Sequence, residues 1–190
     1  MKSNKIIFIT GNKYKFATAK KALADLDLEL VRQDMETPEI QSTNVEDVAM
    51  YSARWASKSL ESPAFLTDCG ISLETFKGFP GPFVKYTNQW FSAEDYINLM
   101  KGKENRSLEA RDCLAFCQPG KEPKLFISVV RGRVAEKCGR KGMTPIDDIF
   151  IPEGCDETLS DMGDEKVIEF WSKNVTYWSD FKKYLKDNIL

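Results

Sequence analysis

Residues 10–15, Thr-Gly-Asn-Lys-Tyr-Lys, combine side chains that bind an anion with a backbone that can come close to one. Gly11 lets the main chain approach a ligand, and the side chains of Thr10 and Asn12 offer hydrogen bonds. Lys15 and the neighbouring lysine add positive charge where a helix would begin with unpaired amides. Phosphate is the anion that fits this combination. An ordinary strand-to-helix connection with a good cap is the alternative, and spacing alone does not separate the two.

Asp68 is the acidic residue best placed to act beside such an anion site. It ends the apolar run 64–68, which is predicted as a strand. Strand carboxyl ends in an open α/β sheet converge on one crevice, so Asp68 and the turn at Thr10 are expected to face the same pocket. A carboxylate there is placed to hold Mg²⁺ or to activate water. A turn or helix-cap aspartate is the alternative.

Two further charged residues stand in loops. Glu39 follows Pro38 in a polar loop, where a merely solvated side chain is the alternative to a functional one. Lys85 ends the segment 77–85, in which two glycines and two prolines surround phenylalanines. Such a segment is predicted to be a stiff loop that presents Lys85 from the start of the next helix.

The chain has no histidine, and this restricts the chemistry more than any motif does. It excludes Ser-His-Asp and Cys-His mechanisms and every histidine-ligated metal site. Hydrolysis would therefore depend on carboxylates, lysines and a hard ion bound through oxygen. The five cysteines lack the paired Cys-x-x-Cys spacing of a zinc site and are predicted to be reduced and structural.

Composition favours one globular domain. The chain has 190 residues, 42% of them hydrophobic, and a formal net charge of −2. That length can bury one substantial core, so a single domain over residues 1–190 is expected. No block of like charge is long enough to follow a nucleic-acid backbone, and no stretch approaches the roughly 20 apolar residues of a membrane span. A cytoplasmic protein that binds neither polymeric nucleic acid nor membrane is predicted.

Apolar periodicity predicts the elements that position these residues, in an order typical of α/β proteins. The expected elements are a strand at 6–9, a helix at 13–26, a strand at 28–31, a helix at 45–60 capped by Asn44 with Asp47, and a strand at 64–68. Ser92 with Asp95 predicts another capped helix, and 108–118 with 125–135 predict a hairpin. Aromatic residues at helical spacing predict a packed helix at the carboxyl end; they are Tyr177, Trp178, Phe181 and Tyr184.

Several separated segments together resemble one family. In chain order they are 9–15, Ile-Thr-Gly-Asn-Lys-Tyr-Lys; 38–41, Pro-Glu-Ile-Gln, with 46–49; 67–70, Thr-Asp-Cys-Gly; and 78–85, Gly-Phe-Pro-Gly-Pro-Phe-Val-Lys. The pattern resembles the inosine triphosphate pyrophosphatase family, whose members remove non-standard purine nucleoside triphosphates. Residues 147–152 and 158–162 look like later segments of that family. The match runs in order across most of the chain and is specific in combination.

The resemblance implies an α/β fold with a mixed, elongated central β-sheet flanked by helices, in two lobes around a deep nucleotide cleft. It also implies a homodimer. The implied reaction is the Mg²⁺-dependent attack of water on a nucleoside triphosphate, which yields the monophosphate and pyrophosphate. Such a reaction requires positioning and charge neutralisation more than a covalent nucleophile, so its chemical step needs no histidine.

The resemblance also implies roles for the residues named above. Thr10, Gly11, Asn12 and Lys15 would hold the triphosphate. Glu39 and Asp68 would bind the metal, and Asp68 would also help to activate water. Lys85 would neutralise phosphate charge, and Asp147 would be one of the substrate-binding residues.

The carboxyl-terminal segment departs from the family. The family carries Ser-His-Arg there to recognise the purine base, whereas this chain has no histidine. In one alignment Thr176-Tyr177-Trp178 takes that place after Lys173, and in another Lys166 replaces the family's lysine. Altered base preference is therefore expected, with Lys173, Tyr177 and Trp178 as substrate-binding residues and the base stacked on Tyr177 or Trp178.

Three functions stay open on the sequence. The first is a Mg²⁺-dependent nucleoside triphosphate pyrophosphatase that acts on a non-standard purine substrate. The second is a nucleotide-binding homologue that has lost turnover, and the third is a dimerisation or interaction scaffold. Both predicted metal carboxylates are present, and chemistry explains them more easily than a scaffold does, which favours the enzyme.

Overall fold

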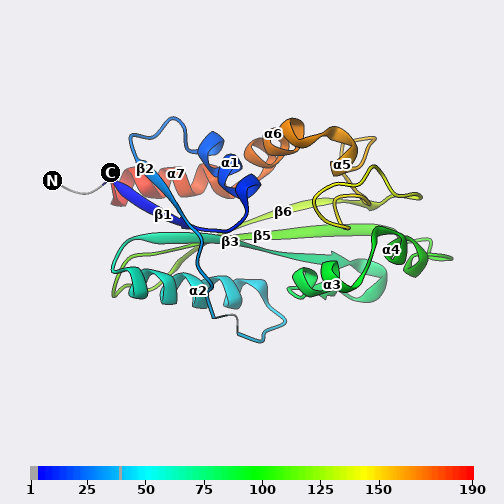
Figure 1. The fold of residues 1–190 in the computed structure, drawn as a ribbon, viewed down its shortest axis with the longest axis horizontal. Helices are drawn as coiled ribbons and strands as arrows, with labels where there is room; N and C mark the ends of the chain where they lie inside the picture. The colour runs from blue at the N-terminus through cyan, green and yellow to red at the C-terminus, as the bar shows by residue number, and fades with distance from the viewer. Residues whose placement is uncertain (1–3, 39) are drawn as a thin grey trace. The chain divides into compact units, whose positions relative to one another are not determined.

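The computed structural model describes residues 4–38 and 40–190, and Figure 1 shows its elements. The strands are β1 Lys5–Ile9, β2 Glu29–Gln33, β3 Ala64–Leu73, β4 Phe79–Gly81, β5 Ser107–Cys117, β6 Lys124–Val134 and β7 Phe150–Pro152. The helices are α1 Lys13–Ala22, α2 Val45–Leu60, α3 Val84–Trp90, α4 Ala93–Leu99, α5 Leu159–Met162, α6 Asp164–Asn174 and α7 Tyr177–Asn188, with a short 3₁₀ turn at Glu74–Phe76. Among these residues, no helix has both the length and the apolar character that crossing a bilayer requires.

The strands form one mixed sheet in the order β2-β1-β3-β5-β6-β7, and β4 pairs with β3. β1 runs parallel to both β2 and β3, whereas β4 is antiparallel to β3 and β7 is antiparallel to β6. The predicted α/β class with a mixed, helix-flanked sheet is therefore confirmed. The deep nucleotide cleft remains a prediction.

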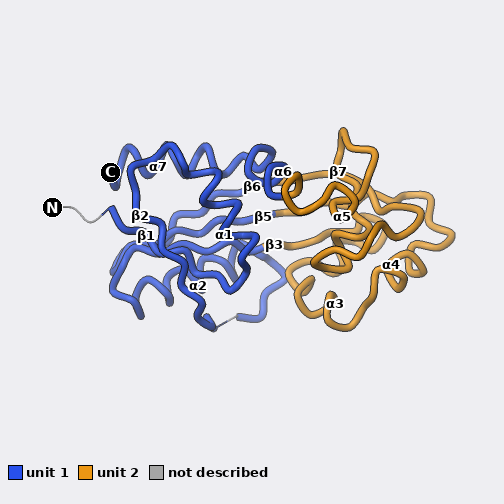
Figure 2. Tube along the Cα trace, turned by 45° about the horizontal axis from the view of Figure 1, so that its top comes forward, with its two compact units in different colours: residues 1–68, 112–128, 168–190 blue, residues 69–111, 129–167 orange. Residues whose placement is uncertain are grey.

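The chain divides into two compact units, which Figure 2 colours separately. Unit 1 comprises residues 1–68, 112–128 and 168–190, and unit 2 comprises 69–111 and 129–167. Three of the four boundaries fall inside β3, β5 and β6 and the fourth inside α6, so these three strands contribute residues to both units. The single domain over residues 1–190 stays a prediction.

The core of unit 1 lies on both faces of its strands. Figure 1 shows α1 and α7 on one side of these strands and α2 on the other. On the α2 side, Ala49, Ala53 and Ala56 are fully buried against strand residues such as Ile7 and Leu66. On the α7 side the core is aromatic: Phe8 stacks on Phe65 with ring centroids 4.4 Å apart, and Phe65 lies 5.1 Å from Phe181. Small residues on one helix and large rings on the other face let both helices pack closely against the same strands.

Unit 2 has its own core, built from strand residues and α4. Its largest buried side chains include Leu73, Tyr96, Met100, Leu108 and Phe150. The buried Tyr96 hydroxyl donates to Thr87 Oγ1 at 2.7 Å. The predicted capping box of Ser92 and Asp95 is present at the start of α4. Both sets of contacts fix the helical segment that follows the proline-rich loop.

Most predicted elements are confirmed, and three details are wrong. The first helix ends at Ala22 instead of Leu26, although Leu23 and Leu26 are buried. Asn44 caps α2 through the Glu46 amide, but Asp47 accepts from Ser42 Oγ and forms no capping box. Asp68 does not end a strand, because β3 continues to Leu73. Residues 71–73 find hydrogen-bonding partners in β4, which is why the strand runs on past Asp68.

Candidate functional site

The turn between β1 and α1 is fixed by its own polar side chains. Asn12 Oδ1 accepts from the amides of Tyr14 and Lys15 at 2.8 and 3.1 Å, and the Asn12 amide donates to Thr10 Oγ1 at 3.1 Å. Asn12 is therefore the helix cap that the sequence suggested as the alternative. The strand-turn-helix geometry is confirmed, while anion binding by Thr10, Gly11 and Asn12 stays a prediction. The cap and an anion site are compatible, because capping uses the side-chain oxygen of Asn12. It uses neither the side-chain NH2 group of Asn12 nor the side chains of Lys13 and Lys15.

Gly11 lies against the side chain of Asp34, a contact that the sequence did not reveal. A Cβ on Gly11 would lie 2.8 Å from Asp34 Oδ1, so any side chain would displace that carboxylate. Asp34 comes directly after β2, and the Thr10 amide donates to the Gln33 carbonyl at 2.9 Å, which aligns the ends of β1 and β2. An exposed acidic residue thus stands beside the predicted anion site.

Lys15 connects α1 with the strand that carries Asp68. Its Nζ donates to the carbonyl oxygen of Thr67 at 2.9 Å. β1 and β3 run in parallel and pair at Phe8 and Phe65, so the turn after β1 is level with residues 67 and 68 of β3. Asp68 and the turn therefore share one region of unit 1, while a pocket common to both stays a prediction. The cause is parallel pairing along a continuing β3, and not the end of a strand.

Asp112 on β5 is a member of this region that sequence reasoning missed. Its Oδ2 accepts a hydrogen bond from the Tyr177 hydroxyl at 3.3 Å. Burial raises the pKa of Asp112 to about 6, the positive charge of Lys15 opposes this rise, and the negative charge of Asp68 adds to it. The sequence contained a signal for Asp112. It lies on the same face of the strand as four apolar residues, all of them buried: Leu108, Ala110, Leu114 and Phe116. A single aspartate in an otherwise apolar strand face indicates a functional or structural requirement for its charge.

Tyr177 and Trp178 are core residues, which contradicts the prediction that a base stacks on them. Their exposed fractions are 3% and 4%, and the two rings pack edge to face with their centroids 4.9 Å apart. The rings of Trp178 and Phe65 also pack in a T-shaped arrangement, with their centroids 6.5 Å apart. The aromatic spacing that predicted a packed helix therefore accounts for both residues. Tyr177 contributes its hydroxyl to Asp112, and neither ring offers a face to a ligand.

Lys173 lies on the surface of α6 and pairs with Glu169 one helical turn earlier, within hydrogen-bonding distance. Pairs of this kind at i and i+4 stabilise a helix by only about 0.3–0.5 kcal/mol. The pairing occupies the lysine without excluding it from a ligand. Its role in substrate binding stays a prediction, and so does the choice between Lys166 and Lys173.

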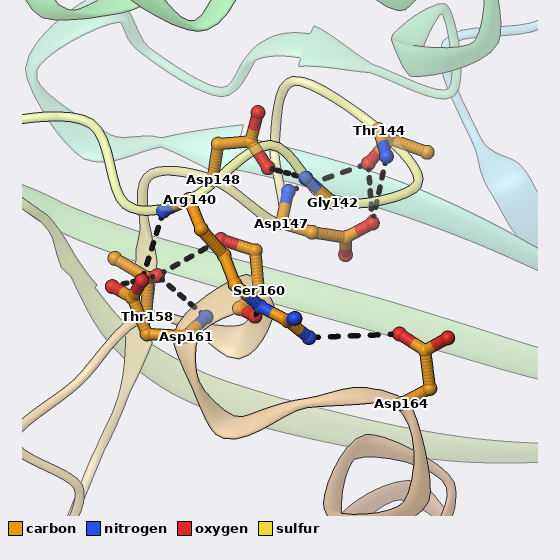
Figure 3. Close-up of polar contacts among 9 residues, drawn as sticks. All are labelled: Arg140, Gly142, Thr144, Asp147, Asp148, Thr158, Ser160, Asp161 and Asp164. Atoms are coloured by element: carbon orange, nitrogen blue, oxygen red, sulfur yellow. Dashed lines mark hydrogen bonds and ion pairs between the residues drawn. The ribbon is translucent and has the colours of Figure 1, made fainter.

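Unit 2 carries the other two predicted substrate residues, Lys85 and Asp147. Lys85 is exposed in the first turn of α3, where the sequence placed it, with Nζ 6.0 Å from the centre of the Tyr86 ring. Asp147 Oδ2 accepts from the Thr144 amide at 3.0 Å and from its hydroxyl at 2.8 Å (Figure 3). Burial raises the pKa of Asp147, and the hydrogen bonds from Thr144 oppose the rise.

The loop around Asp147 is anchored by a polar network, which Figure 3 shows in full. The Gly142 amide donates to Asp148 Oδ1 at 2.6 Å. The Arg140 amide donates to Asp161 Oδ1 at 2.8 Å, and its guanidinium contacts the Ser160 carbonyl and pairs with Asp164 at 3.7 Å. Residues 140–148 are thus attached to α5 and to the start of α6. This attachment holds Asp147 on a defined backbone.

Asp68 is the predicted metal ligand that lies within the described residues. Glu39 lies outside the described residues. Across residues 4–38 and 40–190, no group of three or more acidic or cysteine side chains could hold a metal ion. Asp68 remains as a carboxylate donor whose negative charge reaches the buried Asp112. Carboxylate oxygens are hard ligands of the kind that Mg²⁺ prefers, so Asp68 is a donor that fits this ion.

The chain resembles known proteins over nearly its whole length. The Ham1 family matches residues 6–170. The chain belongs to the Ham1 family. A dITP/XTP pyrophosphatase of Methanopyrus kandleri is 36% identical over 185 residues, covering 97% of this chain and 98% of the relative. A second dITP/XTP pyrophosphatase, of Thermococcus kodakarensis, is 31% identical over 185 residues, covering 97% of this chain and 99% of the relative.

Solved Ham1 structures agree with the fold. A HAM1 protein from Coxiella burnetii superposes with a TM-score of 0.80 at 18% identity, over 96% of this chain and 98% of that one. The Ham1 protein of Staphylococcus aureus gives a TM-score of 0.78 at 20% identity, over the same shares. The family resemblance seen in the sequence is therefore confirmed. The Ham1 family match ends at residue 170, before Lys173, Tyr177 and Trp178.

Proposed function

We propose that the protein is a nucleoside triphosphate pyrophosphatase. Water and a nucleoside triphosphate would give the monophosphate and pyrophosphate, with the bond between the α and β phosphates broken. The names of the near full-length Ham1 relatives support this proposal. The structural observation that carries it is the hydrogen bond from Lys15 to Thr67, because it brings a cation and the carboxylate of Asp68 to one place beside a capped helix start.

The residues of unit 1 have two roles, binding of the triphosphate and activation of water. Thr10, Gly11, Asn12 and Lys15 hold the triphosphate through hydrogen bonds, close backbone approach and positive charge. Asp68 accepts a proton from the attacking water. Lys85, in unit 2, neutralises phosphate charge. No covalent nucleophile is needed, since positioning and charge neutralisation supply most of the rate enhancement in phosphoryl transfer.

Mg²⁺ is the proposed cofactor, held by Asp68 and Glu39. When bound, it offsets the negative charge of the phosphates. We propose a non-standard purine ribo- or deoxyribonucleoside triphosphate as substrate, in keeping with the names of the relatives. Asp147 and Lys173 are proposed as further substrate-binding residues. Base preference differs from that of family members with Ser-His-Arg, because that segment is absent here.

The proposed enzyme is a cytoplasmic homodimer. Light scattering coupled to size-exclusion chromatography would give the mass of the assembly directly. A mass near twice 21.7 kDa supports the dimer, and a mass near 21.7 kDa contradicts it.

Pyrophosphate release tests the activity. Ordinary, deaminated and otherwise modified nucleoside triphosphates would be supplied with Mg²⁺, with Asp68→Asn beside the wild type and Asp180→Asn as a matched exposed control. We expect turnover of one substrate class, lowered about 1,000-fold by Asp68→Asn and unchanged by Asp180→Asn. Saturable nucleotide binding without turnover across the panel would contradict the enzyme and favour a nucleotide-binding homologue.

A further inference from the structure

Asp112 is a half-buried residue whose carboxylate has no role in the proposed reaction. Its Oδ1 is fully buried and has no hydrogen-bond partner among the residues that the structure describes. Its Oδ2 accepts from the Tyr177 hydroxyl at 3.3 Å, and a backbone hydrogen bond from Cys113 also lowers the pKa of the carboxyl group. Burying a carboxylate is unfavourable unless hydrogen bonds and a nearby positive charge offset the loss of water. The position of Asp112 thus calls for a cation.

Lys15 is that cation. Burial raises the pKa of Asp112, and the positive charge of Lys15 is the largest effect that opposes this rise. Its Nζ is fixed at the Thr67 carbonyl, at 2.9 Å, on β3, and β3 is the direct neighbour of β5 in the sheet. An ammonium group has three donors, and Thr67 takes one of them. Lys15 is therefore held on the strand next to the one that carries Asp112, and its charge favours the ionised form of that carboxyl group.

We propose that Asp112 is a positioning residue, which holds the Lys15 ammonium in the orientation that serves the reacting triphosphate, while the Tyr177 hydroxyl orients Asp112. The inference rests on the proposed function, because it concerns how Lys15 is used on a triphosphate. It adds a residue on β5 and one on α7 to the machinery of the β1–α1 turn. It also gives Tyr177 a role that is compatible with its burial.

A negative charge beside a polyanion has a measurable consequence. Asp112 repels the triphosphate in the ground state, yet it restrains the lysine on which the transition state depends. Removing the charge should therefore tighten binding of the bare anion and slow the reaction. A side chain that only supported folding would not produce opposite changes in affinity and rate.

The experiment measures affinity and turnover separately in Asp112→Asn, an almost isosteric change. Inorganic tripolyphosphate serves as the binding probe, followed by calorimetry, because it reports on the phosphate site without a base. Pyrophosphate release on the best substrate of the wild type gives kcat and KM. We expect the Kd for tripolyphosphate to fall about fivefold and kcat to fall about tenfold. Asp180→Asn, exposed on α7, is the matched control and should change neither value.

A double-mutant cycle with Lys15→Met shows whether Asp112 acts through the lysine. In the Lys15→Met background, Asp112→Asn should lower kcat no further, because the group that it positions is gone. Tyr177→Phe removes only the hydroxyl and should lower kcat in the same direction by a smaller factor. This variant keeps the test valid if Asp112→Asn fails to fold.

Two results would overturn the inference while the proposed function stands. One is an active wild type in which Asp112→Asn and Tyr177→Phe leave both kcat and Kd unchanged. The other is a full, additive loss of kcat in the Lys15→Met background. A wild type that releases no pyrophosphate from any substrate is a different result, because it removes the proposed function and this inference together.

Discussion

At the scale of single residues, Asp112 couples the stability of the protein to pH. Burial raises its pKa from the ordinary 3.8 to about 6 in the folded state. The folded protein then keeps a proton that the unfolded chain has already lost, so stability falls as pH rises from about 4 to about 6 and the loss is complete above that window. A rise of about 2 units corresponds to about 3 kcal/mol in the free energy of unfolding.

Asp112→Asn should remove this dependence, because the amide does not titrate. We expect the variant to gain about 2–3 kcal/mol relative to the wild type between pH 4 and pH 7. Urea unfolding at both pH values, with Asp180→Asn as control, measures the difference. A constant offset between variant and wild type across the range would show that Asp112 is not the group responsible.

Trp178 distinguishes a core residue from a base-stacking residue. It is 4% exposed and packs against the rings of Tyr177 and Phe65. Trp178→Leu should therefore cost about 2–4 kcal/mol of stability and leave the ratio of kcat/KM values between purine substrates unchanged. Thermal unfolding together with a two-substrate comparison checks both halves. A changed substrate ratio at unchanged stability would restore the stacking hypothesis.

The sequence was informative about residues wherever chemistry and local spacing coincide. Thr10, Asn12 and Lys15 form a single turn, so their proximity follows from the chain itself. The contact of Lys15 with Thr67 and the approach of Asp112 depend on which strands are neighbours, and a strand order cannot be obtained from periodicity. The helical spacing of Tyr177 and Trp178 already indicated that they are buried. Their alignment with the family's Ser-His-Arg segment led to the prediction of a binding role instead.

At the scale of elements, α1 depends on Asn12 for its start. The Asn12 side chain accepts from two amides of the first turn, so Asn12→Ala leaves both without that partner. We expect a loss of about 1 kcal/mol in the free energy of unfolding. Asn12→Ser keeps a capping oxygen and should retain most of the stability. Urea unfolding of the two variants checks this.

The same pair of variants separates capping from ligand binding. Asn12→Ser lacks the side-chain amide that could donate to a phosphate, so it should fold normally yet bind tripolyphosphate more weakly than the wild type. If Asn12→Ser binds tripolyphosphate as well as the wild type does, Asn12 is a helix cap alone.

Elements were predictable where both ends carry their own signals. The bounds of α2 agree with the prediction because Asn44 marks its start and the apolar stripe runs to Leu60. β3 was predicted too short, because Cys69-Gly70 resembles a break, whereas residues 71–73 pair with β4 and the strand continues. A strand that depends on a distant partner cannot be bounded from its own residues.

At the scale of the whole molecule, the two units share continuous strands. β3, β5 and β6 each supply residues to the core of both units. Fraying one half of such a strand removes hydrogen-bonding partners at the boundary of the other half, so the units should not unfold independently. Linkers between domains, by contrast, carry few contacts and permit separate transitions.

Tryptophan fluorescence can follow each unit separately. The four tryptophans are Trp55, Trp90, Trp171 and Trp178, and Trp90 is the one in unit 2. Variants that retain only Trp90 or only Trp55, the others replaced by Phe, would report on unit 2 and unit 1. We expect their urea midpoints to coincide within each variant with the midpoint from far-UV circular dichroism, as a single cooperative transition requires. Separate fluorescence and dichroism midpoints in the Trp90 variant would mean that unit 2 melts alone, and that three shared strands do not make one cooperative domain.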